Sequence, residues 1–150
     1  KLVLEARSKF ISNFDKKFNV QLAHLDSELI DIIASLRPPV VDTEKERGYV
    51  FDGLNRIFIE ALDNSVLNQV MISLGATSSG SGSLKRLQAL LETFDASGKV
   101  NEMLLPFYVL YDLRVAYSHL TSNKRKSQLI ASSASRLGVK LTLISLQPTT

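Results

Sequence analysis

The 150-residue sequence predicts an all-α fold, an up-and-down bundle of four to five helices with a short extended segment at its C-terminal end. Apolar residues recur every three or four positions along most of the chain, the spacing of one helix face. Prolines and glycines divide these stretches into helix-sized pieces. The length fits one domain spanning residues 1–150. Because the chain opens at Lys1 without Met, we expect it to be a piece of a larger protein with other domains.

The first half predicts two long helices. The first covers residues 2–36, with room for a kink or short break near Asn19, and the prolines at 38 and 39 end it. The second follows a capping-box pattern, in which Thr43 is the N-cap and Glu46 stands three positions later. Its apolar spacing continues to about residue 74, and Gly75 ends it.

The second half predicts shorter helices after the segment "ATSSGSGS" at 76–83, a flexible loop that resembles an engineered connection. Ser83 is expected to cap a third helix through Phe94. A fourth helix begins near residue 101 or 102, so that Pro106 falls in its first turn, and its apolar residues on all sides predict a central position. A final helix ends at Gly138, and "VKLTLISL" at 139–146 predicts the extended segment.

Composition limits the class of protein and its partners. Hydrophobic residues make up 45% and charged residues 22% of the chain, as in soluble globular proteins. The longest nearly apolar run, residues 103–113, is too short for a membrane span, which needs about 20 residues. The chain has no cysteine, which excludes disulfides and thiolate zinc sites and suits the cytoplasm.

Charge is distributed unevenly. Residues 1–98 carry 11 Lys and Arg against 13 Asp and Glu, whereas residues 99–150 carry 7 against 2, giving net charges of −2 and +5. The C-terminal third therefore suits an anionic partner, unless this charge run is a solvated tail.

Several chemistries lack their residues. The sequence has no glycine-rich phosphate loop, no H-E-x-x-H zinc motif and no calcium-binding loop, so we expect neither a metal nor a cofactor. One of the two histidines, His24, is interpreted as a surface residue of the first helix.

The segment "DLRVAYSHL", residues 112–120, holds the candidate catalytic pair, Arg114 and His119. Arg keeps its charge and binds phosphate oxygens through a two-pronged fork, and His transfers protons near neutral pH. RNA cleavage needs a proton taken from the 2′-hydroxyl, charge stabilised on the phosphoryl oxygens and a proton given to the leaving 5′-oxygen. This pair can supply most of that without a metal.

Neighbouring residues are candidates for substrate binding. Tyr117 suits a stacking platform for a base, although its helical spacing also fits a core aromatic residue. Ser118 suits a helix cap or a phosphate donor. Lys124, Arg125 and Lys126 form a basic run that would attract a polyanion, or that simply begins a solvated helix.

"RVAYSH" has the R-x4-6-H form of the HEPN superfamily, and the late position of the motif in a helical chain also resembles that family. Members include toxins, anti-phage effectors, CRISPR-associated nucleases and ribonuclease L. The resemblance implies a two-fold homodimer with a composite active site, in which Arg114 holds the scissile phosphate of RNA and His119 acts as general acid and base. Catalytic members usually carry Asn, Asp or His directly after the Arg, whereas this chain has Val115.

Three functions follow from these observations. The first is a metal-independent endoribonuclease in stress or anti-phage defence. The second is a non-catalytic domain of the same kind, for dimerisation or nucleotide and RNA binding, and the third is a helical protein interaction module. Side chains five positions apart on a regular helix point about 140° apart. The nuclease hypothesis therefore needs either a backbone break between Arg114 and His119 or a contribution from each subunit.

Overall fold

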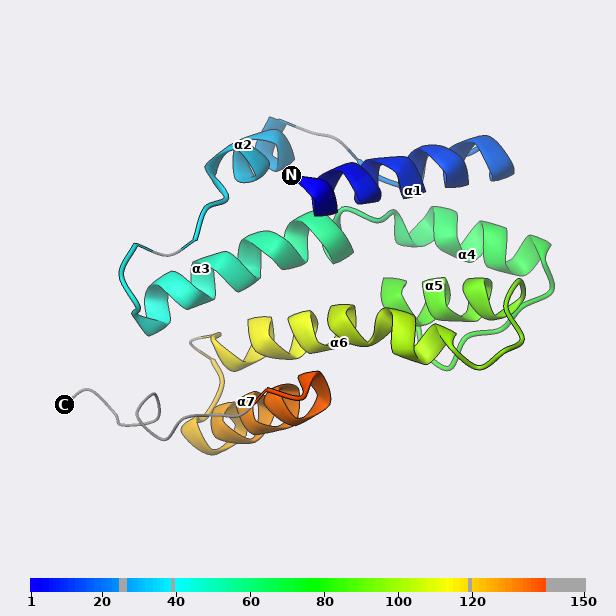
Figure 1. The fold of residues 1–150 in the computed structure, drawn as a ribbon. Coiled ribbons are helices and arrows are strands. Elements are labelled where there is room, and N and C mark those ends of the chain that lie inside the picture. Colours follow the sequence, from blue (N-terminus) through cyan, green and yellow to red (C-terminus); the bar gives the residue numbers. More distant parts are fainter. Residues whose placement is uncertain (25–26, 39, 119, 140–150) are drawn as a thin grey trace.

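The computed structural model describes residues 1–24, 27–38, 40–118 and 120–139. These residues form seven α-helices and one π-helix and no named strand, so the all-α prediction is confirmed and the predicted four to five helices are too few (Figure 1). The predicted extended segment at 139–146 lies outside the described residues from position 140 onward. In chain order the elements are α1 Leu2–Phe18, α2 Ser27–Ser35, α3 Glu44–Asn55, η1 Arg56–Glu60, α4 Asn64–Ser73, α5 Ser83–Glu92, α6 Val100–Ala116 and α7 Asn123–Leu137.

The first predicted helix is divided into α1 and α2. Asn19 ends α1 in the left-handed conformation, with φ 51° and ψ 52°, which fits the break expected near this residue. The chain then runs past the end of η1, where the His24 amide donates to the Ala61 carbonyl at 3.1 Å and the Asp63 amide donates to the Leu22 carbonyl at 2.7 Å. This isolated antiparallel bridge replaces helical hydrogen bonds on both segments.

The second predicted helix is also divided. Thr43 caps α3, as predicted, by accepting from the Glu46 amide at 3.2 Å. The helix widens into η1, in which the Ala61 amide bonds to the Arg56 carbonyl at 2.9 Å, five residues back. Asp63 then caps α4 by accepting from the amides of two following residues. Apolar spacing alone predicted one helix here because that spacing continues across the break.

Three details of the later helices also differ from the predictions. Gly82, not Ser83, is the N-cap of α5. Pro106 lies inside α6 rather than in its first turn. The last helix ends at Gly138 with φ 68°, as predicted, and the structure shows that Ser122 caps its start.

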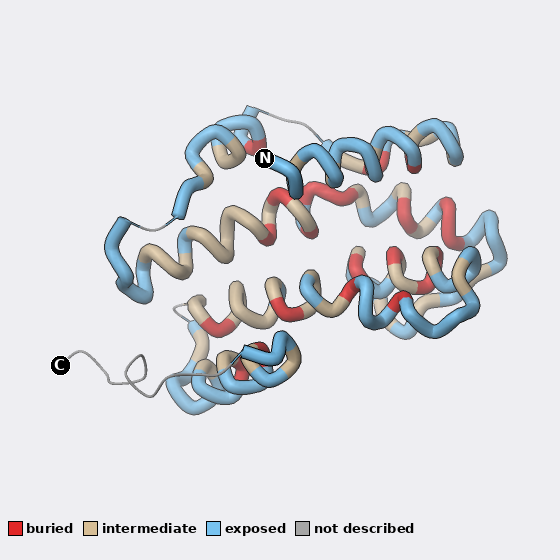
Figure 2. The backbone as a smooth tube through the Cα atoms, viewed as in Figure 1, coloured by how far each residue is buried: buried red, intermediate tan, exposed pale blue. Residues whose placement is uncertain are grey.

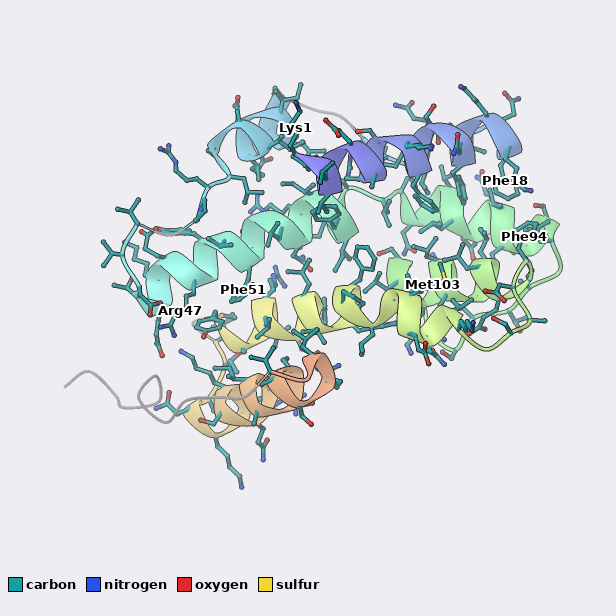
Figure 3. All side chains as sticks on the ribbon, viewed as in Figure 1. Lys1, Phe18, Arg47, Phe51, Phe94 and Met103 are labelled. Atoms are coloured by element: carbon teal, nitrogen blue, oxygen red, sulfur yellow. The ribbon has the colours of Figure 1, made fainter. Side chains whose placement is uncertain are left out.

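α6 occupies the predicted central position, packing against α3, α5 and α7 (Figure 1). Buried residues gather on the helix faces that look toward one another (Figure 2). The larger core cluster joins α1, α4, α5 and α6, and a smaller one joins α2 to η1. At one end of the bundle Phe18 and Phe94 approach each other, with ring centroids 6.1 Å apart (Figure 3). α6 thereby carries the candidate segment along α3 and toward α7.

Candidate functional site

Arg114 lies in the last turn of α6 and faces the end of α3. Its Nε atom is 3.5 Å from Asp52 Oδ1, and its Nη2 atom is 3.6 Å from Glu60 Oε1. Both distances are too long for hydrogen bonds. The side chain is 40% exposed, and ion pairs as exposed as these contribute only about 0–1 kcal/mol. The guanidinium is thus oriented but not firmly held.

Two further charged residues complete the surroundings of Arg114. The Nε atom of Arg56 is 3.2 Å from Asp52 Oδ2, and the same guanidinium pairs with Glu28. The negative charge of Asp52 raises the pKa of Arg56. We call Glu28, Asp52, Arg56, Glu60 and Arg114 the Arg114 cluster. Its three carboxylates and two guanidinium groups give a net charge of −1, so an incoming phosphate has to replace a carboxylate beside Arg114.

Asn55, at the junction of α3 and η1, contacts the Arg114 cluster through Glu60. It is only 1% exposed, and its Nδ2 group donates to Glu60 Oε1 at 2.7 Å. Its Oδ1 atom is buried without a hydrogen-bond partner among the described residues. Short π-helices occur frequently at functional sites, and an unpaired buried oxygen is costly to maintain. The end of α3 thus combines a π-helix with an unpaired buried oxygen, a combination that makes it a candidate functional region.

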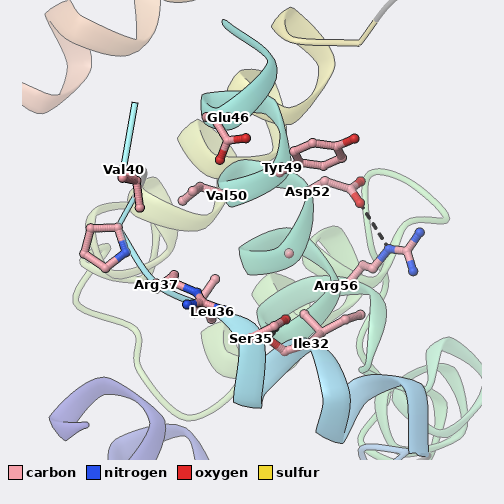
Figure 4. A pocket seen from close by; sticks show the side chains of 12 residues that line it. Ile32, Ser35, Leu36, Arg37, Val40, Glu46, Tyr49, Val50, Asp52 and Arg56 are labelled. Carbon is pink, nitrogen blue, oxygen red and sulfur yellow. Dashed lines mark hydrogen bonds and ion pairs between the residues drawn. The ribbon is translucent and has the colours of Figure 1, made fainter. Parts of the chain in front are cut away.

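A depression of about 500 Å³ between α2 and α3 adjoins the cluster (Figure 4). Asp52 and Arg56 line it, and their ion pair lies at its edge. Tyr49, which is 62% exposed, presents an aromatic ring on the same wall. The depression therefore combines an exposed ring with a guanidinium group.

The helix carrying Arg114 ends at Ala116. After it, the Ser118 amide donates to the Val115 carbonyl at 3.0 Å, and Ser118 Oγ accepts from the Leu120 amide at 3.4 Å. His119 lies outside the described residues. α6 ends three positions before this histidine, and the described residues Tyr117 and Ser118 are no longer helical.

Tyr117 packs inward rather than standing free. Its ring lies 5.4 Å from that of Phe51, which points from α3 toward α6 (Figure 3). Lys126 is on α7, and its Nζ atom lies 4.9 Å from the centroid of the Tyr117 ring. This arrangement favours the core-aromatic interpretation of Tyr117 over a base-stacking platform.

The basic run of α7 separates into two kinds of residue. Lys126 Nζ is 2.7 Å from Glu44 Oε2, and its side chain is only 19% exposed. Lys124 and Arg125 are exposed and enter none of the ion pairs formed among the described residues. Only these two are open to a polyanion.

His24, interpreted from sequence as a surface residue, is 62% exposed, and its Nε2 atom lies 2.9 Å from Asp63 Oδ2. Within the described ranges, no group of three or more His, Cys, Asp or Glu side chains is placed to hold a metal ion. None of the helices in this part of the chain is long and apolar enough to cross a membrane.

The sequence pointed to Arg114 but not to Asp52, Asn55, Arg56 or Glu60, because these reach it from a helix about sixty positions earlier. No family model matches the chain, and neither a curated protein nor a solved structure matches it. The resemblance to the HEPN superfamily thus rests on the motif at 112–120 and the helical architecture.

Proposed function

We propose that this chain is a metal-independent endoribonuclease domain that works as a homodimer on RNA, in cytoplasmic stress or anti-phage defence. The observation that carries the proposal is the state of Arg114. Its guanidinium is 40% exposed and is oriented by two long ion pairs, so it can exchange a carboxylate for a phosphate. The dimer and the biological setting come from the resemblance to HEPN proteins.

In the proposed reaction, Arg114 binds the non-bridging oxygens of the scissile phosphate and stabilises their charge as the 2′-oxygen attacks. His119 takes the proton of the 2′-hydroxyl or supplies one to the leaving 5′-oxygen, and its counterpart in the second subunit fills the other role. The products are a 2′,3′-cyclic phosphate and a 5′-hydroxyl. Asp52 and Glu60 orient Arg114 before RNA arrives, without holding it firmly.

The depression beside the cluster supports RNA as the substrate class. Tyr49 offers an exposed ring on which an unpaired base can stack. Asp52, which lines the same depression, pairs with both Arg56 and Arg114. A single strand lying there would place a base against Tyr49 and the adjoining phosphate near Arg114.

The test is cleavage of end-labelled single-stranded RNA in EDTA. We expect the wild-type protein to produce 2′,3′-cyclic phosphate ends, and both Arg114→Ala and His119→Ala to lose this activity by at least about 100-fold, the usual contribution of a general acid or base. His24→Ala is the control for loss of a histidine, since the His24 side chain is 62% exposed and pairs with Asp63 rather than with Arg114. Absence of cleavage, or equal cleavage by His119→Ala, contradicts the proposal.

A second candidate, RNA binding without catalysis, is favoured by Val115 after the motif arginine and by the exposed cations Lys124 and Arg125 on α7. It predicts salt-dependent RNA affinity that His119→Ala leaves intact. Neutralising Lys124 and Arg125 together to Gln should lower the slope of log affinity against log salt by up to about 1.4, at about 0.7 per phosphate contact. The double variant Lys9→Gln and Lys16→Gln, with the same charge change on α1, should leave the slope unaltered.

A further inference from the structure

A second cavity lies under α1, away from the Arg114 cluster. It has a volume of about 240 Å³. Ala6, Phe10 and Ile11 of α1 form one wall, and Phe58, Leu87 and Phe107 face them. Among the described residues that line it, Arg7 alone has a charged or polar side chain. The cavity is thus an apolar chamber with a single cation.

The conformation of η1 explains how Arg7 is held. In this π-helix the Ala61 amide bonds to the Arg56 carbonyl and the Leu62 amide bonds to the Ile59 carbonyl. The Ile57 carbonyl instead accepts a hydrogen bond of 2.8 Å from Arg7 Nε. The π-helix therefore presents a backbone oxygen that fixes the guanidinium at the cavity wall.

One nitrogen of the fixed guanidinium is left without a partner. Arg7 Nη2 is buried and makes no hydrogen bond among the described residues. Burial lowers the pKa of Arg7, because its charge is partly removed from water. A buried charged donor without an acceptor is costly, and carboxylates are the anions whose two oxygens best match an arginine fork. Arg7 lines the cavity, so a carboxylate bound there would bring an acceptor to its guanidinium.

The volume limits the rest of the ligand. An apolar protein cavity of about 150 Å³ can hold benzene, so a cavity of this size accommodates about ten non-hydrogen atoms. We propose that the cavity under α1 binds a medium-chain monocarboxylate of the size of octanoate, with the alkyl chain against Phe10, Phe58 and Phe107 and the carboxylate on Arg7. This site shares no residue with the proposed nuclease site, so either proposal can fail without the other.

The experiment compares octanoate with 1-octanol by calorimetric titration of the whole chain. We expect octanoate to bind about tenfold or more tightly than octanol, which is the effect of one hydrogen bond to a charged group. Arg7→Met should remove this preference and leave octanol binding intact. Lys9→Met is the matched control, because it removes an exposed charge two positions away on the same helix. Ala6→Phe, which fills the cavity, should weaken both probes.

Three results would overturn the proposal. They are no octanoate binding at millimolar concentration, equal affinity of the wild type for both probes, and an octanoate preference that survives Arg7→Met or is lost in Lys9→Met. If Arg7→Met fails to fold, the test uses the ratio of octanoate to octanol affinity in the wild type, together with the effect of Ala6→Phe. A ratio near one, or octanoate binding that Ala6→Phe does not weaken, rejects the site. Octanol binding alone would identify an apolar pocket without carboxylate selectivity and equally reject it.

Discussion

Asp52 joins the two guanidinium groups of the Arg114 cluster. Its two oxygens face different guanidinium groups, with Oδ1 3.5 Å from Arg114 Nε and Oδ2 3.2 Å from Arg56 Nε. A carboxylate between two arginines occupies the kind of position that a phosphate would take. Under the proposed function, RNA bound at Arg114 would compete with the Asp52 carboxylate.

Asp52→Asn should accordingly tighten RNA binding. Removing this negative charge changes the cluster from −1 to neutral and frees two guanidinium groups for phosphate. For partly exposed groups we expect an effect of about 0.5–1 kcal/mol, a two- to fivefold gain in affinity measured by fluorescence anisotropy at fixed salt. Asp31→Asn, an exposed position on α2, is the control. Unchanged or weaker binding by Asp52→Asn would exclude a phosphate at this position.

Gly48 offers a test of the contact between α3 and the end of α6. It lies inside α3, and a Cβ added there would sit 3.6 Å from both Cβ and the carbonyl oxygen of Tyr117, an ordinary contact distance. Gly48→Ala should therefore stabilise the protein by about 0.5–1 kcal/mol, since Ala is the better helix former. Gly138→Ala should instead destabilise it, because Gly138 has φ 68°. Urea unfolding measures both changes, and the same sign for both would contradict this geometry.

At the scale of elements, α4 depends on a cap that apolar spacing did not reveal. Asp63 accepts from the amides of Ser65 and Val66 at 2.9 and 3.1 Å, and His24 Nε2 lies 2.9 Å from its other oxygen. The Val66 amide, followed by the Ser65 amide and His24, lowers the pKa of Asp63. The carboxylate form is therefore the one that stabilises the start of α4.

Asp63→Ala should cost about 0.5–2 kcal/mol at pH 7, the usual value of an N-cap. Because the pKa of Asp63 is lower in the folded state, its contribution is complete above the unfolded value of about 3.9 and disappears as pH falls through the folded value. Urea unfolding from pH 7 down to pH 2 should show the difference between wild type and variant shrinking only below about pH 4. A constant difference would mean that the charge of Asp63 plays no part in the cap.

The helix types and most helix ends were predictable from local signals, and the interruptions were not. Thr43 and Gly138 act through neighbouring backbone, so the sequence alone located them. The break at residues 61–63 is held by the Leu22 carbonyl and the His24 amide, about forty positions away. η1 likewise has no local signal, yet it turns the Ile57 carbonyl toward Arg7 and Glu60 toward Arg114. Tertiary contacts thus created the features that shape both candidate sites.

At the scale of the whole molecule, the fold pairs part of the positive charge of the C-terminal third with carboxylates. Residues 99–150 carry an excess of +5, but the fold pairs three of these cations with carboxylates. Arg114 meets Asp52 and Glu60, Lys126 meets Glu44, and Arg136 meets Asp112. The basic surface predicted from composition is therefore reduced, within the described residues of α7, chiefly to Lys124 and Arg125. Composition showed which third of the chain carries the positive excess, but it could not show which of these cations the fold leaves unpaired.

The two core clusters predict that the molecule does not open as one unit. α2 buries one residue, Leu29, against η1, whereas α5 places Leu87 and Leu90 in the larger cluster with α1, α4 and α6. Local opening of α2 breaks the small cluster and leaves the large one intact. Amides of α2 should therefore exchange with solvent at a lower opening free energy than amides of α5.

Two truncations separate local from global opening. Leu90→Ala should lower the exchange protection of α5 by about 2–5 kcal/mol, because global unfolding exposes Leu90. It should leave α2 unchanged as long as α2 opens without breaking contacts of Leu90. Leu29→Ala should lower protection in both helices by similar amounts, since local and global opening both expose Leu29. Native-state hydrogen exchange resolved by NMR tests this, and an equal loss in α2 and α5 for Leu90→Ala would show that the two clusters unfold together.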